Sequence, residues 1–147
     1  MDNLGKLPAV FARKCSVRRI DKETAAAFLN INHRMGYATS RYRYGAFISQ
    51  EKEERLVAVA TFSNARRMND GSRSYEWIRY ASLRGTRVVG GMGKLLEAFV
   101  SEIGPDDVMT YVDSSVSDGA SYQELGFILA GTVSRNGFTN LKFRKTF

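Results

Sequence analysis

The sequence predicts an α/β chain of one domain, with a mixed, mostly antiparallel central sheet flanked by helices. Two hairpin-like pairs of strand patterns, at 44–64 and 127–147, indicate antiparallel strands. Between them, a strand, a glycine-rich turn, an amphipathic helix and a second strand follow at 74–112, which is typical of a strand–helix–strand crossover. The length of 147 residues suits a single domain spanning 1–147.

The first part of the chain is expected to supply one helix and three strands. Residues 1–12 read as a loose lead-in, and Cys15–Ile20 alternates as a strand does. Asp21 can cap a helix over Lys22–His33, which carries apolar residues on one side. An irregular, basic and aromatic segment at 34–43 leads to two strands, Tyr44–Ser49 and Leu56–Asn64.

The second part alternates strands and helices. Its central element is a helix over Gly93–Ile103, with Leu95, Leu96, Phe99, Val100 and Ile103 at helical spacing. The other expected elements are a polar loop at Arg66–Arg73, strands at Ser74–Leu83 and Val108–Val112, a short helix at Asp118–Leu125, and a hairpin of Phe127–Val133 and Phe138–Phe147 across Asn136-Gly137.

Composition excludes several classes of chemistry. Cys15 is the only cysteine and His33 the only histidine, so disulfide frameworks, zinc-cysteine sites and two-histidine metal sites are excluded, and we expect no metal. No apolar stretch is long enough for a membrane span or a signal peptide, so we expect a cytoplasmic protein. We expect the chain to be a monomer or a homodimer.

Charge is unevenly distributed. The net charge is +7, yet the segment 97–124 contains seven acids and no Lys or Arg. Either the chain binds a polyanion, such as a phosphate-bearing cofactor or a nucleic acid, or it is merely basic. We expect the acids Glu97, Glu102, Asp106 and Asp107 to face solvent on the side away from the acceptor, so that charge reversal of Glu102 and Asp106 changes neither acceptor use nor coenzyme A binding much.

A glycine-rich loop before the central helix favours phosphate binding over an empty turn. Gly90, Gly91 and Gly93 let backbone N–H groups point outward at a helix start, between the basic residues Arg87 and Lys94. The loop is not a P-loop, because Leu95 stands where that motif has Ser or Thr. It is not a dinucleotide-binding fingerprint either, because Leu96 stands where that motif has its third glycine.

Residues 87–92 read Arg-Val-Val-Gly-Gly-Met before the expected central helix, and residues 122–127 read Tyr-Gln-Glu-Leu-Gly-Phe at the end of the expected short helix. With these two segments the chain resembles the GNAT superfamily of acyl-CoA-dependent N-acetyltransferases. That family has an R/Q-x-x-G-x-G/A loop before a helix and a later Y-x-x-L-G-F motif. The segment 87–92 fits the first except at Met92, and 122–127 fits the second completely. The resemblance implies acetyl-CoA as cofactor, transfer of the acyl group to an amine, and contacts to the coenzyme from Arg87, Val89, Gly90, Gly91, Met92, Gly93 and Lys94.

Ser115 and Asp118 depart from the family's usual Asn and Ala. With these departures, the chain looks like a divergent branch from phages and mobile elements that includes Mom-type DNA-modification proteins. The alternative function is therefore binding of nucleic acid, or modification of its bases, by a GNAT-like protein without ordinary acetyltransferase activity.

Four residues are candidates for the chemistry. The resemblance places Tyr122 beside the coenzyme sulfur, where a phenol could donate a proton to the departing thiolate, although Tyr122 could instead anchor its helix in the core. Candidates for the base are Asp113 at a strand end, Glu76 on the central strand and His33 at a helix end.

The acceptor could be held by arginines. Arginines interleaved with tyrosines supply charge for phosphates and rings for base stacking, although such loops can also be simply solvated. The candidates are Arg34, Arg41, Arg43, Arg66 and Arg67.

Overall fold

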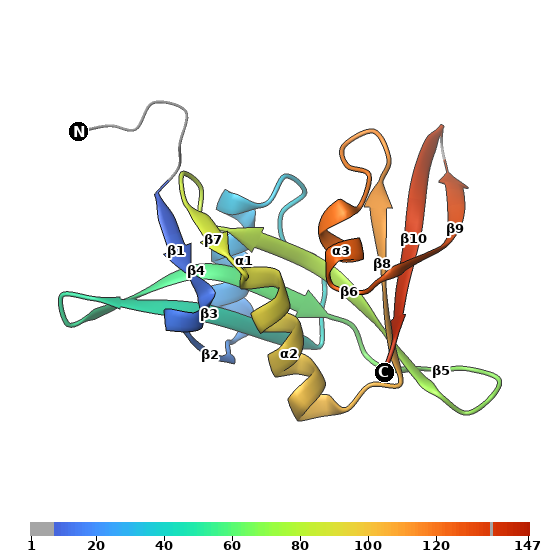
Figure 1. The fold of residues 1–147 in the computed structure, drawn as a ribbon, viewed down its shortest axis with the longest axis horizontal. Helices are drawn as coiled ribbons and strands as arrows, with labels where there is room; N and C mark the ends of the chain where they lie inside the picture. Colours follow the sequence, from blue (N-terminus) through green and yellow to red (C-terminus); the bar gives the residue numbers. More distant parts are fainter. Residues whose placement is uncertain (1–7, 136) are drawn as a thin grey trace. The chain divides into compact units, whose positions relative to one another are not determined.

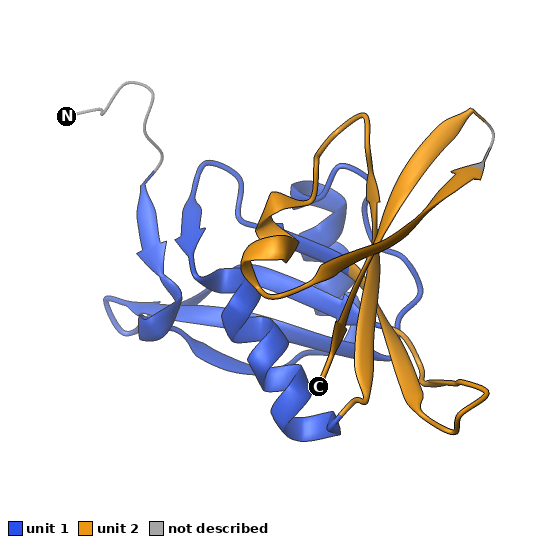
Figure 2. Cartoon of the chain, turned by 45° about the vertical axis from the view of Figure 1, so that its right-hand side comes forward, with its two compact units in different colours: residues 1–62, 79–104 blue, residues 63–78, 105–147 orange. Residues whose placement is uncertain are grey.

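The structure, a computed structural model, describes residues 8–135 and 137–147. The chain divides into two compact units, and strand β6 (Arg73–Ser82) contributes residues to both (Figure 2). Unit 1 contains the described residues up to Phe62 together with Arg79–Gly104, and unit 2 contains Ser63–Ile78 and Pro105–Phe147. The chain is mixed α/β with mostly antiparallel strand pairs, as the sequence predicts.

Unit 1 contains an antiparallel sheet and two longer helices (Figure 1). Its elements are β1 (Ala9–Phe11), the 3-10 turn η1 (Ala12–Lys14), β2 (Ser16–Arg19), α1 (Lys22–Asn32), β3 (Tyr42–Gln50), β4 (Glu53–Phe62), β7 (Arg87–Val89) and α2 (Gly91–Ile103). Strands β2, β3 and β4 pair in that order, and β6 lies next to β4.

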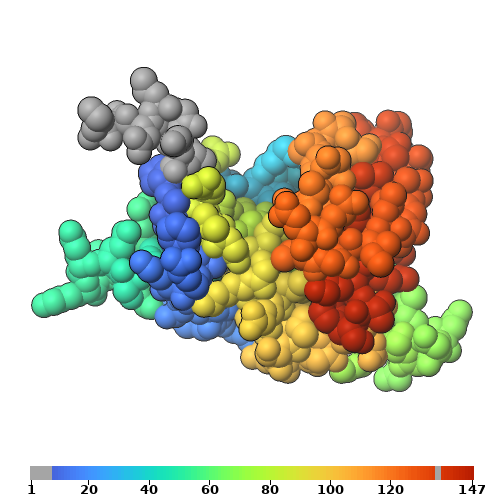
Figure 3. All heavy atoms as spheres, in the orientation of Figure 1, coloured from blue at the N-terminus to red at the C-terminus, as the bar shows by residue number. Residues whose placement is uncertain are grey.

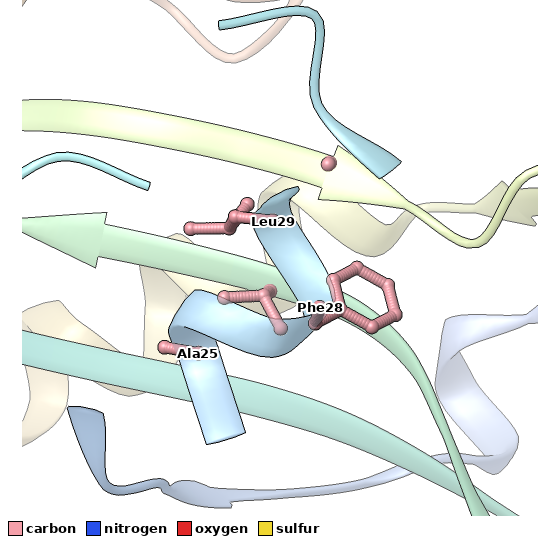
Figure 4. Close-up of a cluster of buried hydrophobic side chains, with 5 residues drawn as sticks. Ala25, Phe28 and Leu29 are labelled. Atoms are coloured by element: carbon pink, nitrogen blue, oxygen red, sulfur yellow. The ribbon is translucent and has the colours of Figure 1, made fainter. Parts of the chain in front are cut away.

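Helix α1 begins as the sequence predicts. The Asp21 carboxylate accepts a hydrogen bond from the Thr24 N–H at 2.8 Å, which satisfies a donor that the first turn leaves open. One face of the helix is buried against the sheet (Figure 4). The buried residues of this cluster are Ala25, Phe28 and Leu29 of α1, Val59 of β4 and Ala81 of β6.

Helix α2 covers the opposite face of the same sheet. The ring of Phe99 stacks on that of Phe62 with centroids 4.0 Å apart and planes 5° apart. Val59 belongs to the α1 cluster, and Phe62 follows it by an odd number of positions on β4, so the two residues face opposite sides. Unit 1 is therefore a sheet between two helices (Figure 1).

The expectation of a loose lead-in at residues 1–12 is wrong for Ala9–Phe11, which form strand β1. Ala9–Phe11 pairs in parallel with Arg87–Val89, so part of the expected glycine loop is strand β7. Three residues are too few to show the alternation of apolar and polar positions by which a strand is predicted, and the partner strand lies far along the chain. Residues 1–7 of the expected lead-in lie outside the described residues.

Unit 2 is built around β6 and the strands that follow α2. Its further elements are β5 (Arg66–Arg67), β8 (Asp107–Asp113), α3 (Ala120–Glu124), β9 (Ile128–Arg135) and β10 (Phe138–Thr146). Strand β8 pairs in parallel with β6 only over Ser74–Glu76, and in antiparallel fashion with β10 along its whole length. Strands β10 and β9 form the expected hairpin, of whose turn Asn136 lies outside the described residues.

Several boundaries differ from the prediction. Strands β3 and β4 begin two and three residues earlier than expected, and α2 begins at Gly91 rather than Gly93. The expected polar loop at 66–73 contains the short strand β5, because Arg66 and Arg67 pair with Ser74 and Arg73. Among the described residues, no helix is long and apolar enough to cross a membrane.

Candidate functional site

The start of α2 is built by glycine. Gly90 is the N-cap residue, with φ at 79° and ψ at 9° in the left-handed region, where a side chain would be strained. The N–H of Lys94 then donates to the Gly90 carbonyl at 3.0 Å, which closes the first turn. The loop predicted from sequence is thus the end of β7, one left-handed glycine and the first turn of a helix.

This helix start favours an anion. Gly90 offers no side chain to cap the N–H groups of the first turn, and the turn contains no acidic residue. Lys94 follows instead, although a cation at a helix N-terminus opposes the helix dipole. Uncapped donors, a positive helix end and a lysine together form a setting in which a phosphate is stabilised.

A groove of about 560 Å³ adjoins the helix start within unit 1. In Figure 3, β1 and η1 (blue) lie beside the first turns of α2 (yellow) at the surface. Four predicted coenzyme residues, Val89, Gly90, Gly93 and Lys94, line the groove. Of the others, Arg87 is exposed on β7, Met92 is half-buried, and Gly91 is buried.

Tyr122 lies on α3 in unit 2, within an aromatic cluster. Its ring contacts those of Trp77, Phe127 and Phe143, with centroids 5.3, 5.6 and 6.5 Å away. Burial raises the pKa of the Tyr122 phenol, and a side-chain contact with Thr110 acts in the opposite direction. The phenol therefore keeps its proton at neutral pH, which suits a hydrogen-bond donor.

Thr110 is a residue that the sequence analysis missed. Its hydroxyl donates to the carbonyl oxygen of Trp77 at 2.9 Å and contacts the Tyr122 phenol, so it connects β6, β8 and α3. A buried threonine on a strand has no sequence signature, because threonine is common in strands.

The Y-x-x-L-G-F motif closes α3. The Phe127 N–H donates to the Tyr122 carbonyl and the Gly126 N–H to the Gln123 carbonyl, each at 3.0 Å. Gly126 has φ at 93°, so the pair of bonds forms the left-handed helix ending that glycine permits. Within unit 2, the motif therefore fixes Tyr122 and Phe127 next to each other.

Two of the three base candidates also lie in unit 2. The Asp113 carboxylate accepts hydrogen bonds from the N–H and hydroxyl of Ser115, at 2.9 and 2.7 Å, and so it shapes the turn after β8. Glu76 is half-buried on β6, and its backbone N–H donates to the Ser63 hydroxyl at 2.8 Å. Among residues 8–135 and 137–147, no cluster of His, Cys, Asp and Glu could hold a metal ion.

His33, the third candidate, is the C-cap of α1 in unit 1. Its ring nitrogen Nδ1 accepts a hydrogen bond from the Met35 N–H at 2.9 Å. Burial, then the charges of Arg79 and Arg34, lower the pKa of the imidazole. His33 is therefore neutral at neutral pH with its proton on Nε2, and its one basic lone pair is already used.

The candidate acceptor arginines fall in both units. Arg34 and Arg41 in unit 1 and Arg66 and Arg67 in unit 2 are exposed. Arg43 is half-buried, and its guanidinium donates to the backbone carbonyls of Ser40 at 3.0 Å and Ile20 at 3.4 Å. Arg43 thus ties the chain before β3 to the chain before α1.

Of the four acids expected to face solvent, Glu97, Glu102 and Asp106 are exposed, and Asp107 is buried, contrary to expectation. Glu102 accepts a hydrogen bond from the buried Tyr44 hydroxyl at 2.6 Å and pairs with Arg19 at 3.3 Å. Asp106 accepts a hydrogen bond from the Arg73 N–H at 2.7 Å. Asp107 is buried, and its carboxylate is hydrogen-bonded to the Ser74 hydroxyl. These contacts join residues that are distant in the sequence, so they cannot be predicted from the local sequence pattern.

Comparisons with known proteins bear on the fold. No protein-family model matches the sequence, and no curated protein matches it either. The structure is similar to the NatC complex bound to Gag peptide and CoA, at 12% identity and TM-score 0.69 over 91% of this chain and 99% of the matched chain.

Two further solved structures agree. One is Arabidopsis thaliana NAA60 in complex with acetyl-CoA, at 13% identity and TM-score 0.66, covering 90% of this chain and 98% of that one. The other is ribosomal-protein-alanine N-acetyltransferase from Brucella melitensis, at 15% identity and TM-score 0.63, covering 90% and 99%. The chain thus shares its fold with these solved acetyltransferase structures, which agrees with the fold that the resemblance implied.

Proposed function

We propose that this chain is an acyl-CoA-dependent N-acyltransferase that uses acetyl-CoA and transfers the acetyl group to an amine. The observation that carries the proposal is the start of α2, where uncapped N–H groups, Gly90 and Lys94 adjoin a groove. A pyrophosphate needs several donors and a positive field, and this helix start supplies both. The groove's volume of about 560 Å³ is in the range of ligand sites.

Acetyl-CoA supplies the acyl group as a thioester, whose C–S bond breaks when the amine nitrogen forms its bond to the carbonyl carbon. The amine proton must pass to a base or to water, and the thiolate must be stabilised. Tyr122 holds its proton at neutral pH and can donate a hydrogen bond to a thiolate. Because its pKa is raised, the phenol stabilises the thiolate as a donor more readily than it gives up the proton.

Coenzyme A binding tests the proposal. In calorimetry with the purified chain, we expect saturable binding that Gly93→Glu weakens by about tenfold or more, because a carboxylate in the first turn competes with the phosphate for the helix end. Lys94→Gln should weaken binding in the same direction, whereas Lys22→Gln, an exposed lysine on α1, is the matched control.

Thermal unfolding accompanies these measurements. A glutamate in the first turn interacts favourably with the helix dipole, so Gly93→Glu should not lower the melting temperature, and weaker binding would then not be due to unfolding. Absence of coenzyme A binding by the wild-type chain, or equal binding by all variants, would overturn the proposal.

The second candidate function is nucleic-acid binding or base modification, in line with the resemblance to the Mom-type branch. The observation in its favour is the exposure of Arg66 and Arg67 on β5, next to Arg73 in register on β6. A gel-shift titration should then show affinity falling steeply with salt, and Arg66→Gln with Arg67→Gln should reduce that salt dependence. Binding that is absent or insensitive to salt would remove this candidate.

A further inference from the structure

The groove beside α2 has a wall that the sequence pattern does not predict. Phe11 of β1 and Arg13 of η1 line this wall, whereas Lys94 lines the groove from α2. A Cβ atom on Gly90 would stand 3.7 Å from the Cβ atom of Ala12, so η1 packs directly against the helix start. All of these residues belong to unit 1. The groove is therefore completed by the N-terminal segment that packs beside the helix.

The groove presents an apolar surface next to the helix start. Phe11 and Val89 are register partners in the parallel pairing of β1 with β7. Both line the groove, and their exposed fractions are 38% and 41%, which is high for large apolar side chains. Val17 and Ala98 add further apolar atoms to the lining. Apolar side chains left exposed together in a groove indicate a ligand with an apolar part.

Two cations line the same groove. The guanidinium carbon Cζ of Arg13 lies 4.8 Å from the centroid of the Phe11 ring, so a cation–π contact holds the guanidinium at the groove wall. Within residues 8–135 and 137–147, neither Arg13 nor Lys94 forms an ion pair. Glu97 is the one acid among the described residues that line the groove. Two cations beside an apolar wall suit an anionic ligand that also has a flat apolar group.

We propose that this groove binds the adenosine 3′-phosphate end of coenzyme A, with Arg13 on the 3′-phosphate and Phe11 and Val89 beside the adenine ring. The inference rests on the proposed acyltransferase function, in which the pyrophosphate lies at the start of α2. In coenzyme A, the pyrophosphate separates the thiol-bearing arm from the adenosine 3′-phosphate. The groove contains none of the four residues considered for the chemistry, which suits the end of the coenzyme that does not react.

Each part of the nucleotide meets a suitable group. A guanidinium forms strong, charge-assisted hydrogen bonds with a phosphate, and Arg13 therefore determines specificity for the 3′-phosphate. The purine ring buries apolar surface against Phe11 and Val89. The Glu97 carboxylate is an acceptor, and the ribose 2′-hydroxyl and the adenine amino group are the donors that it can bind.

Calorimetry with coenzyme A and dephospho-coenzyme A, which lacks only the 3′-phosphate, tests the role of Arg13. At low ionic strength, the wild-type chain should bind coenzyme A about tenfold more tightly than dephospho-coenzyme A. Arg13→Gln should weaken coenzyme A binding by about fivefold to tenfold and reduce this preference to about twofold or less. Lys14→Gln is the matched control, because Lys14 is the next residue and is exposed and positive, but does not line the groove.

Adenosine 3′,5′-bisphosphate, the nucleotide end of coenzyme A, tests the groove without the thiol-bearing arm. The wild-type chain should bind it saturably, and Arg13→Gln should weaken this binding. Phe11→Leu keeps an apolar side chain in β1 but removes the aromatic ring, so it should weaken the binding by about threefold or more. Thermal unfolding of both variants shows whether the fold is kept.

The outcomes separate this inference from the proposed function. If the wild-type chain binds coenzyme A and dephospho-coenzyme A equally well, the groove assignment is refuted and the acyltransferase stands. The same holds if Arg13→Gln keeps the wild-type preference, or if Lys14→Gln reduces it as much. Binding of adenosine 3′,5′-bisphosphate without binding of coenzyme A would refute the acyltransferase and leave the nucleotide groove standing. Absence of binding by both ligands would refute both.

Discussion

The hydroxyl oxygen of Tyr80 occupies the space where a Cβ atom on Gly91 would stand. Tyr80 lies on β6 and Gly91 begins α2, so strand and helix approach closely at this glycine, and an added side chain would have to displace the Tyr80 hydroxyl. Val88 crowds the same position, with its Cγ1 atom 3.0 Å from that Cβ. A side chain at Gly90 would be strained by the backbone angle and one at Gly91 by this contact, so substitutions at either position would also perturb the fold.

Gly91→Ala should lower the free energy of unfolding by about 1–3 kcal/mol, because the added methyl group overpacks the contact with Tyr80. Tyr80→Phe removes the obstructing oxygen, so the double variant should recover part of that loss. Urea unfolding of the two single variants and the double variant measures the coupling. Strictly additive effects would show that the Tyr80 hydroxyl is not the obstacle.

Tyr122→Phe should lower kcat by about 10²- to 10⁴-fold, because the ring contacts stay and only the donor hydroxyl is lost. Thiol release measures the rate, while calorimetry should give an unchanged affinity for coenzyme A. Tyr111→Phe, at an exposed tyrosine on β8, is the matched control. A variant with wild-type kcat would assign Tyr122 to packing of its aromatic cluster alone.

Glu102→Ala should cost about 1–3 kcal/mol of stability, because it leaves the hydroxyl of Tyr44, which is 2% exposed, without its acceptor. Glu97→Ala on the same helix removes an exposed acid and should have little effect. Chemical denaturation of both variants separates the two roles. Equal stabilities of the two variants would mean that the hydrogen bond from Tyr44 to Glu102 does not stabilise the fold.

Stability should fall as the pH rises above about 10. Burial, followed by the hydrogen bond to Glu102, raises the pKa of Tyr44 above its ordinary value of 10.0. The unfolded chain therefore loses this proton at a lower pH than the folded chain, which favours unfolding in alkali. Tyr44→Phe should flatten this dependence in denaturation measured between neutral and alkaline pH.

Stability should also fall as the pH drops below about 6.5. The pKa of His33 in the folded chain is lower than its ordinary value of 6.5, so the unfolded chain binds the proton first. His33→Gln should flatten the stability profile between pH values of about 7 and 5, where the carboxylates contribute less. An unchanged slope would mean that other groups set the acid sensitivity.

The elements with local signals were predictable. The Asp21 cap and the spaced apolar residues of α2 placed both long helices, because capping and periodicity are encoded over a few positions. Contacts between distant segments were not predictable in this way. Nothing near Glu102 indicates that Tyr44 is its partner, and nothing near Arg43 shows that it binds the Ile20 carbonyl.

The residues of the candidate site show the same difference between local motifs, which are predictable, and long-range contacts, which are not. The glycine start of α2 and the Tyr122–Phe127 ending of α3 have motifs, since backbone angles demand glycine at Gly90 and Gly126. The roles of Thr110 and Tyr80 depend on side chains that meet only after folding, and so these residues appear in no pattern.

The parallel pairing of β1 with β7 has a consequence for how the chain reaches its final state. Ala9–Phe11 is synthesised long before Arg87–Val89, and the two cannot join until β2, β3, β4 and α1 have been made. Such a long-range contact closes a large loop, which costs chain entropy and slows folding. The segment that leads into the glycine start of α2 therefore depends on a contact between two parts of the chain that lie more than seventy positions apart.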